Sequence, residues 1–458
     1  MPTINPTPVP LFAPISNRDA SILKDSRLYN GFAEKEGDVI WVYKRPGLSL
    51  LTAGAGPSAG LGVHNWLGDI YTVFGPALFK NGVSLGTVDA TNGVYRFTST
   101  LGATPQLFLT NPAHAYSYSV SLGLVEQTAD TNYPVATVPG TVYLDGTTYV
   151  FDTTNHIIGS NFNDLTTWDA LNTLLAQIEP DQAVALAKQL VYVIALKNTS
   201  TEVFYDAGNP VGSPLGPVQG SKLNVGCRAA GSVKDVGGDL CWVGTTRLGS
   251  ARVMTMSSVK GESIATPAVN RLMSSLNYTT TWSWSLEVCG HVFYIVTMVS
   301  SNLTMAFDLT AKQWYIWTDP NGNYLPIVSS TYDSSARPVL QHATDGNLYT
   351  MSISQFTDNG TQFPFDLYTP NFDGGLRLNK SVSTVEIIAD EITTNVNISW
   401  SDDDYQTFTT PVPLALNQEN PFIDDGSTFR KRAYHINHLD STFLRIQALH
   451  LTVSPGTT

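Results

Sequence analysis

One short pattern returns along most of this chain and restricts its fold more than any other feature. From about residue 60 to 357, a turn residue, often glycine, precedes a run of β-branched and aromatic residues, at intervals of roughly 30 to 60 residues. Self-similar β units at such a period are typical of propeller blades, each of which buries its faces by stacking on its neighbours. We therefore predict an all-β fold built on a β-propeller of six or seven blades, and a generic multi-sheet β protein is the alternative. The recurring stretches begin at Gly68, His114, Gly146, Lys188, Gly238, Gly290 and Gly346.

The composition agrees with many short strands joined by turns. Only 14% of the 458 residues are charged, whereas glycine and proline number 36 and 26. The 38 acidic residues outweigh the 25 basic ones and give a net charge of −13, and an acidic surface does not hold DNA by neutralising phosphates. No signal peptide is expected, and no stretch of about 18 apolar residues predicts a membrane span.

Changes in pattern along the chain predict three parts. Residues 1–59 form an N-terminal arm and its first strands, residues 60–364 the propeller, and residues 365–458 a C-terminal β-sandwich-like domain. The proline-rich start, residues 1–18, has no core of its own, so we expect it to become ordered on a neighbouring subunit or another partner.

A helical insertion is expected within the propeller at residues 164–189. Asp164 can cap a helix that carries apolar residues on one stripe, and Pro180 can end it and open a second short helix. The stripe consists of Leu165, Trp168, Leu171, Leu175 and Ile178.

Residue types suited to catalysis occur, but without the spacing that catalysis needs. The acidic run Asp402–Asp404 lies in a stretch that resembles an Asp-box, a hairpin cap, with Tyr405 where that motif has glycine and Phe408 where it has tryptophan. His435 and His438 are three apart in a predicted strand and so face opposite ways. We therefore predict no catalytic residue, no cofactor site and no metal site, and we expect no cofactor.

The cysteines and the basic residues give two further expectations. An odd count of three cysteines without paired spacing predicts buried free thiols. Arg430, Lys431 and Arg432 form the basic cluster of the chain, and we take them as candidates for a subunit contact. A solvated strand edge and a DNA contact are the alternatives. The cysteines are Cys227, Cys241 and Cys289.

Four stretches in order resemble a known family. They are DSRLYNGFAEKEGD followed by KRPGL; LAKQLVYVIALKNTSTEVFYDAGNP; SVKGESIATPAVNRLMSSL; and ISWSDDDYQTF followed by FRKRAYH and TFLRIQAL. Together they resemble the tail hub, or nozzle, proteins of short-tailed bacteriophages, also called packaged DNA stabilisation proteins. The third stretch resembles that family's helix after a blade.

The resemblance implies a non-enzymatic virion protein, made in the host cytoplasm. It would form a hexameric ring in the tail, below the portal and adaptor proteins. The ring would extend the DNA channel, help retain packaged DNA, and anchor tail fibres or spikes, while DNA passes through without specific binding.

A carbohydrate-active propeller, either a sialidase-like enzyme or a lectin, is the alternative function. A sialidase-type site would need arginines that converge with a tyrosine and carboxylates around the propeller axis. The arginines available in blade-like stretches are Arg96, Arg228, Arg247 and Arg252.

Overall fold

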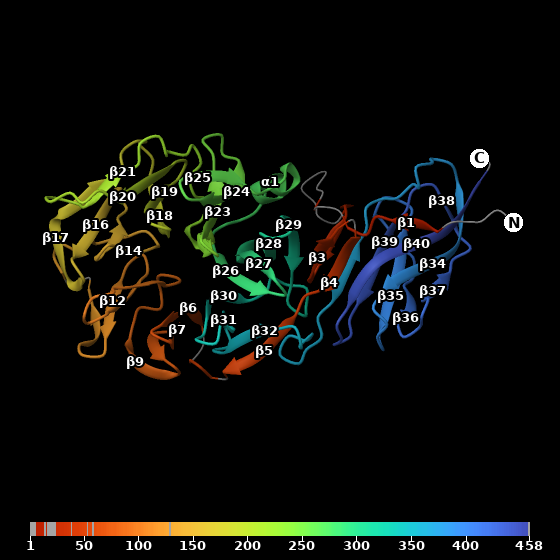
Figure 1. Cartoon of the computed structure of the whole chain (residues 1–458), viewed down its shortest axis with the longest axis horizontal. Helices are drawn as coiled ribbons and strands as arrows, with labels where there is room; N and C mark the ends of the chain where they lie inside the picture. The colour runs from red at the N-terminus through yellow and green to blue at the C-terminus, as the bar shows by residue number, and fades with distance from the viewer. Residues whose placement is uncertain are drawn as a thin grey trace.

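Seven four-stranded antiparallel units surround a common axis in the computed structural model, which describes residues 6–12, 15, 24–37, 39–52, 54–56, 59–127 and 130–456 (Figure 1). Six of these units, or blades, are separate sheets, and the seventh is the first part of a nine-stranded sheet. The first strand of each unit packs near the next unit, and the last unit returns to the first. The expected propeller of six or seven blades is thus confirmed.

The six separate sheets are β6–β9 (Gly60–Trp66, Asp69–Phe74, Ala77–Lys80, Val83–Thr87), β10–β13 (Arg96–Ser99, Leu107–Thr110, Ala115–Ser119, Gly123–Glu126), β14–β17 (Val142–Leu144, Thr147–Phe151, His156–Asn161, Asp164–Leu175), β18–β21 (Ala183–Gln189, Tyr192–Lys197, Thr201–Asp206, Leu215–Pro217), β22–β25 (Lys234–Val236, Asp239–Thr245, Ala251–Ser257, Lys260–Ser263), and β30–β32 with β5 (Ile327–Tyr332, Pro338–His342, Leu348–Ser352, Gly47–Thr52). The seventh unit comprises β26–β29 (Thr281–Val288, His291–Met298, Leu303–Asp308, Gln313–Trp317).

Tight turns explain why glycine recurs in the sequence pattern. Leu67 and Gly68 have φ of 54° and 85° between β6 and β7, and Asp145 and Gly146 have 45° and 90° between β14 and β15. Two successive positive φ angles define the hairpin turn whose twist matches that of the flanking strands. Most of the recurring stretches are therefore the second strand of a blade, which follows this turn.

The ring is closed by a strand from near the start of the chain. β5 pairs antiparallel with β32, with Leu48 opposite Met351, and so completes the last blade. Because the chain continues from β5 into β6, the same segment also links this last blade covalently to the first one. The first strands of the chain lie beside the propeller, next to the C-terminal strands, and the chain enters the propeller at β5 (Figure 1).

Two sheets form a sandwich beside the propeller, at the right of Figure 1. One continues the seventh blade from β29 through β2, β33, β39, β35 and β36 (Arg27–Tyr29, Phe365–Tyr368, Ala433–His438, Asn395–Ser401, Val412–Ala415). The other contains β3, β4, β40, β34 and β37 with β1 and β38 (Gly31–Glu36, Val39–Lys44, Arg445–Pro455, Lys380–Ala389, Phe422–Asp424, Thr7–Val9, Thr428–Phe429). One buried core runs from the seventh blade into this sandwich. The division of the chain into three domains stays a prediction.

The expected helical insertion at 164–189 is wrong. Residues Asp164–Leu175 are β17, the outer strand of a blade, and Ala183–Gln189 are β18, the first strand of the next. Leu165 and Trp168 are buried, but Leu171 is 69% exposed, so the apolar stripe does not form one packed face. Asp164 does accept a backbone hydrogen bond two residues on, but within a turn that opens a strand.

Two other expectations from the sequence need correction. In the described part of the arm, β1 pairs with β40 of the same chain, and the side chains of Leu11 and Ile15 are buried against that chain. Residues 6–12 and 15 are therefore placed by contacts within the chain and not by a neighbouring subunit. Residues 1–5, 13–14 and 16–18 lie outside the described residues. Cys289 is exposed rather than buried, because it occupies a tight turn between β26 and β27.

A short helix, α1 (Pro267–Ser274), follows the blade of β22–β25, as the family resemblance implied. Thr266 caps it by accepting a hydrogen bond from the backbone N–H of Val269, and Pro267 fits the first turn because its missing N–H would have no partner there.

Replacing Thr266 by alanine is expected to lower the free energy of unfolding by about 1 kcal/mol, because the cap is lost. Denaturant titration followed by circular dichroism measures this. Thr266→Ser keeps the hydroxyl and should change it by much less; equal losses in both variants would contradict the capping role.

Candidate functional site

Arg432, the last residue of the basic cluster, lies inside the C-terminal sandwich. Its Nε and Nη2 donate to the two carboxylate oxygens of Asp402 at 2.7 and 2.8 Å, and its Nη1 donates to Asp425 Oδ2 at 2.6 Å. Burial lowers the pKa of Arg432, but the hydrogen bonds and charge interactions with Asp402 and Tyr434 together outweigh burial and raise it overall. The fully buried side chain of Arg432 is thus held within its own chain, where it joins two loops.

The other two residues of the cluster are exposed. Lys431 Nζ lies 2.9 Å from Asp404 Oδ1, and Arg430 Nε donates to Asn379 Oδ1 at 3.0 Å. Both contacts are at the surface, where an ion pair contributes little to stability. A subunit contact stays a prediction, and the side chains available for it are those of Arg430 and Lys431.

The acidic run beside this cluster caps the hairpin between β35 and β36. Asp403 Oδ1 accepts hydrogen bonds from the backbone N–H groups of Gln406 and Thr407 at 3.1 and 2.9 Å, and its Oδ2 accepts one from the Thr407 hydroxyl. These hydrogen bonds, chiefly from Thr407, lower the pKa of Asp403 to about 2. Tyr405 has a φ of 68°, which explains why an Asp-box has glycine at this position. The structural interpretation of the run is confirmed.

A buried ion pair marks the junction between the propeller and the sandwich. Arg45 Nη2 and Nη1 lie 2.7 and 3.1 Å from the two oxygens of Asp358, and both side chains are buried. Arg45 Nε also donates to Asn30 Oδ1, and Nη2 to the Thr318 carbonyl. Asp358 accepts a further bond from the backbone N–H of Leu48. One guanidinium thus connects strands of both parts.

The residues around Arg45 explain the KRPGL stretch of the resemblance. Lys44 is buried and donates to the Asp440 carbonyl at 2.7 Å, and burial lowers its pKa to about 8. A Cβ at Gly47 would lie 2.1 Å from the Thr357 carbonyl oxygen, so no other residue fits. The sequence pointed to this site only through the family resemblance. The signal that could have indicated it was the pair of adjacent basic residues, Lys44 and Arg45, before Pro-Gly in a chain with few charges.

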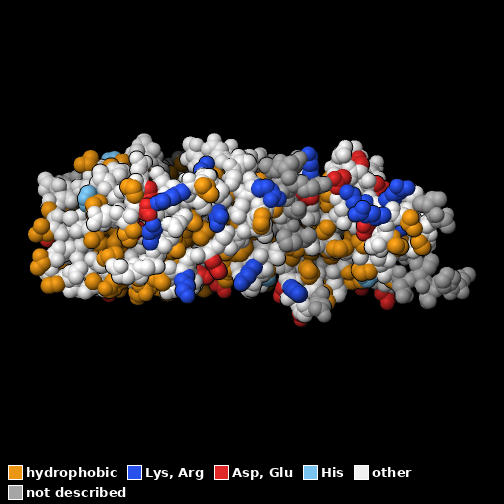
Figure 2. Space-filling view, turned by 90° about the horizontal axis from the view of Figure 1, so that it is seen from above, with side chains coloured by type: hydrophobic (Ala, Val, Ile, Leu, Met, Phe, Trp, Pro, Cys, Tyr) orange, Lys and Arg blue, Asp and Glu red, His pale blue; other side chains and the backbone are white. Residues whose placement is uncertain are grey.

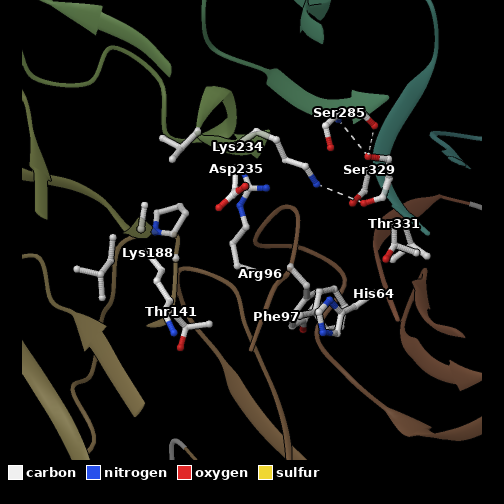
Figure 3. A pocket seen from close by; sticks show the side chains of 18 of the residues that line it. His64, Arg96, Phe97, Thr141, Lys188, Lys234, Asp235, Ser285, Ser329 and Thr331 are labelled. Carbon is white, nitrogen blue, oxygen red and sulfur yellow. Dashed lines mark hydrogen bonds between the residues drawn. The ribbon is translucent and has the colours of Figure 1, made fainter. Parts of the chain in front are cut away.

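The propeller axis contains a cavity of about 420 Å³ (Figure 3). Every blade contributes residues to it, from its first strand or the residues beside that strand. Of the four arginines available in blade-like stretches for a sialidase-type site, only Arg96 lines the cavity. Arg228 lies over the ring of Tyr278, and Arg247 pairs with Glu179. The arrangement does not assemble a sialidase-type centre.

The paired histidines have separate partners. His435 Nε2 lies 2.7 Å from Asp366 Oδ1, whereas the Nδ1 of buried His438 lies 3.4 Å from Lys44 Nζ. Among the described residues, no group of three His, Cys, Asp or Glu side chains has the geometry of a metal site. Within those same ranges, no helix has the length and hydropathy needed to cross a membrane.

Comparison with known families decides the family. The model of the family described as Bacteriophage P22 Gp10, beta-propeller, matches residues 32–320. The chain belongs to this family of phage DNA stabilisation proteins. The match to the Gp10 family covers six of the seven blades completely, and of the blade made by β30–β32 and β5 it covers only β5. It also includes Arg45 and α1. The family resemblance inferred from the four stretches is confirmed.

Solved structures and curated proteins add little to this assignment. The extracellular domain of BT4673 from B. thetaiotaomicron has 10% identity and a TM-score of 0.43 over 86% of this chain, which spans 58% of that structure. BBS1N, solved in complex with ARL6DN, has 8% identity and a TM-score of 0.39, with 68% of this chain and 98% of that one covered. A search of curated proteins found no match.

Proposed function

We propose that this chain is a non-enzymatic structural subunit of a phage tail. It acts in a hexameric ring that extends the DNA channel below the portal and adaptor proteins, helps retain packaged DNA, and anchors tail fibres or spikes. The observation that carries the proposal is the match of residues 32–320 to the Gp10 propeller family.

The architecture supports a load-carrying role. A single nine-stranded sheet runs from the seventh blade into the sandwich, and the buried Arg45–Asp358 pair lies at the same junction. Backbone hydrogen bonds across a continuous sheet resist bending at a domain boundary better than a linker does. The propeller and the sandwich therefore form one elongated unit (Figure 1), as a subunit held between neighbours in a ring requires.

Light scattering and negative-stain imaging of the purified chain, and of tails assembled with it, test this function. A particle of about six times the 49.6 kDa chain mass, seen as a ring at the tail, is the expected result. A chain that stays monomeric and is absent from tail particles would overturn the proposal.

A rim of exposed apolar side chains on the blades far from the sandwich supports assembly. Leu101 and Phe162 are 80% and 74% exposed, and their loops meet at Gly102 and Asn163. Hydrophobic side chains gather toward this end of the face in Figure 2. Contiguous exposed apolar surface commonly marks a protein contact, so we assign this apolar rim, residues 101–102 and 162–163, to a contact between subunits.

Replacing Phe162 by glutamate is expected to weaken ring formation by tenfold or more, because burying one large apolar side chain is worth about 1.5–3 kcal/mol and the charge adds a desolvation cost. Sedimentation analysis of the assembled fraction measures this. The control is Leu248→Glu, a change at a leucine outside the rim that is even more exposed than Phe162. Assembly of Phe162→Glu at the wild-type level would show that the rim is not a subunit contact.

DNA can pass through a channel freely only if the channel surface does not bind it tightly. Each Lys or Arg contact with a phosphate releases counterions and adds salt-dependent affinity. The net charge is −13, Arg432 is paired inside the chain, and Lys431 faces Asp404. On the face in Figure 2, acidic side chains lie beside several of the basic ones. We infer that the channel-facing surface is acidic or neutral.

The isolated ring is accordingly expected not to shift duplex DNA in a gel, even at low salt. Like-charge repulsion extends over a Debye length of about 10 Å at 0.1 M salt and grows as salt falls. A charge-reversed variant, Asp404→Lys, serves as a comparison for added phosphate contacts. Tight, salt-sensitive binding by the wild-type ring would contradict an acidic or neutral lining.

A further inference from the structure

The axial cavity of the propeller gathers positive charge in an otherwise acidic protein. Arg96 on β10, Lys188 on β18 and Lys234 on β22 line it, whereas the lining contains one carboxylate, that of Asp235. Among the described residues, no carboxylate lies within ion-pair distance of any of these three cations. Asp235 is exposed and accepts a hydrogen bond from the Gly238 N–H at 3.0 Å.

The cations retain donors that their own chain does not use. Arg96 Nη2 donates to the Ala230 carbonyl and Lys234 Nζ to the Ser330 carbonyl, each at a long 3.3 Å. A guanidinium has five N–H donors and an ammonium three, so most donors of both groups have no partner among these hydrogen bonds, and both side chains line the cavity. Figure 3 shows both side chains extending into the same space.

The positive charges lie close enough to disfavour one another. Burial, and after it the charge of Arg96, lowers the pKa of Lys234 to about 8. Burial also lowers the pKa of Arg96. A partly buried pair of like charges without a counterion is costly, and an anion between them would remove that cost.

The rest of the wall suits a phosphate group with a small organic part. Ser285, Ser329 and Thr331 supply hydroxyl groups on the side of β26 and β30 (Figure 3). The rings of His64 and Phe97 stack at 5.4 Å and 5°, and burial lowers the pKa of His64 to about 4, so that ring is neutral near pH 7. The volume of about 420 Å³ lies within the range of small-molecule sites and exceeds what a bare phosphate fills.

We propose that the propeller axis is a binding site for a small phosphorylated molecule, with Arg96 and Lys234 as its phosphate ligands and Lys188 at its edge. An arginine fork and a lysine are the usual partners of a phosphate dianion, and hydroxyl groups can donate to its remaining oxygens.

Calorimetric titration of the full chain with inorganic phosphate at low ionic strength tests the proposal. One saturable site per chain is expected, and Arg96→Gln and Lys234→Gln should each weaken binding about tenfold, the loss typical of one charge-assisted contact. The matched control is Lys260→Gln on β25, an exposed lysine at the outer edge of the blade to which Lys234 belongs. It should bind as the wild type does.

Two further arms keep the test decisive. Lys188 is exposed, so Lys188→Gln should fold normally even if Arg96→Gln and Lys234→Gln do not. It should weaken phosphate binding about threefold. The absence of saturable binding up to about 10 mM phosphate, a Kd that corresponds to about 3 kcal/mol of binding free energy, would overturn the proposal. Equal affinity in every variant would overturn it too. So would equal affinity for acetate, or a duplex oligonucleotide that needs Arg96 to bind and displaces phosphate, which would assign the site to carboxylates or to DNA.

Discussion

Arg45→Met is expected to lower the free energy of unfolding by about 3–5 kcal/mol, because it leaves a buried carboxylate without its partner. Asp358 is 6% exposed, and the N–H of Leu48 would be its remaining hydrogen-bond donor among the contacts described above. The lost hydrogen bonds to Asn30 and the Thr318 carbonyl add to the effect. Urea unfolding followed by tryptophan fluorescence measures it.

Two control variants distinguish the effect of breaking a buried ion pair from the effect of removing a positive charge alone. Arg252 is exposed on β24, so Arg252→Met should change the free energy of unfolding by no more than about 0.5 kcal/mol. The double variant Arg45→Met with Asp358→Leu should lose less than the sum of the two single losses, because it removes both charges together. A loss below about 1 kcal/mol in Arg45→Met would mean that the junction does not depend on this pair.

Arg432→Met is the second change expected to have a large effect, with a loss of about 3 kcal/mol. Asp425 is almost fully buried and would lose its ion-pair partner, whereas Asp402 is 41% exposed and can be partly solvated, which places the loss at the lower end for buried pairs. The sandwich should unfold first, because both carboxylates lie in its loops. Limited proteolysis with mass spectrometry of the first fragments locates the unfolding, and thermal denaturation gives its size.

Arg430→Met is the matched control, because Arg430 is in the same cluster but exposed. Its effect should stay within about 0.5 kcal/mol. Equal effects of the two substitutions would contradict the buried role of Arg432. The pair also separates stability from assembly, since only Arg430 and Lys431 present basic groups to a neighbour.

Local sequence signals predicted the parts of the fold that are themselves local. A turn of two residues with positive φ followed by a strand occurs in a short segment, as at Leu67 and Gly68, and its physical requirement is visible in the residue types. The hairpin cap at Asp403 is another such case, since the hydrogen bonds of the Asp403 side chain join residues within four positions of it. These signals gave the propeller and the hairpin cap.

Patterns of apolar spacing predicted the type of element and its buried face less reliably. The burial of a side chain depends on neighbours in space that the local sequence does not reveal. The apolar residues from Leu165 to Ile178 have helical spacing, yet those up to Leu175 lie in an edge strand on which Leu171 faces solvent, and Ile178 lies beyond its end. In β40, register shifts against β34 place Ile446 and Leu449, which have opposite parity, both in the core. A single alternating face could not have predicted that.

The sequence by itself determined the all-β class, the repeated hairpin unit, and, through the order of four short stretches, the family. Only the tertiary structure decided how the ring closes through β5 and that Arg45 meets a carboxylate 313 positions away. It also decided that Arg432 is buried while Arg430 and Lys431 stay exposed. The axial cavity with Arg96, Lys188 and Lys234 also belongs to this second group. The physical reason is the same in each case: turn chemistry acts over a few residues, whereas the partner of a charge is set by which distant strands the closed ring brings together.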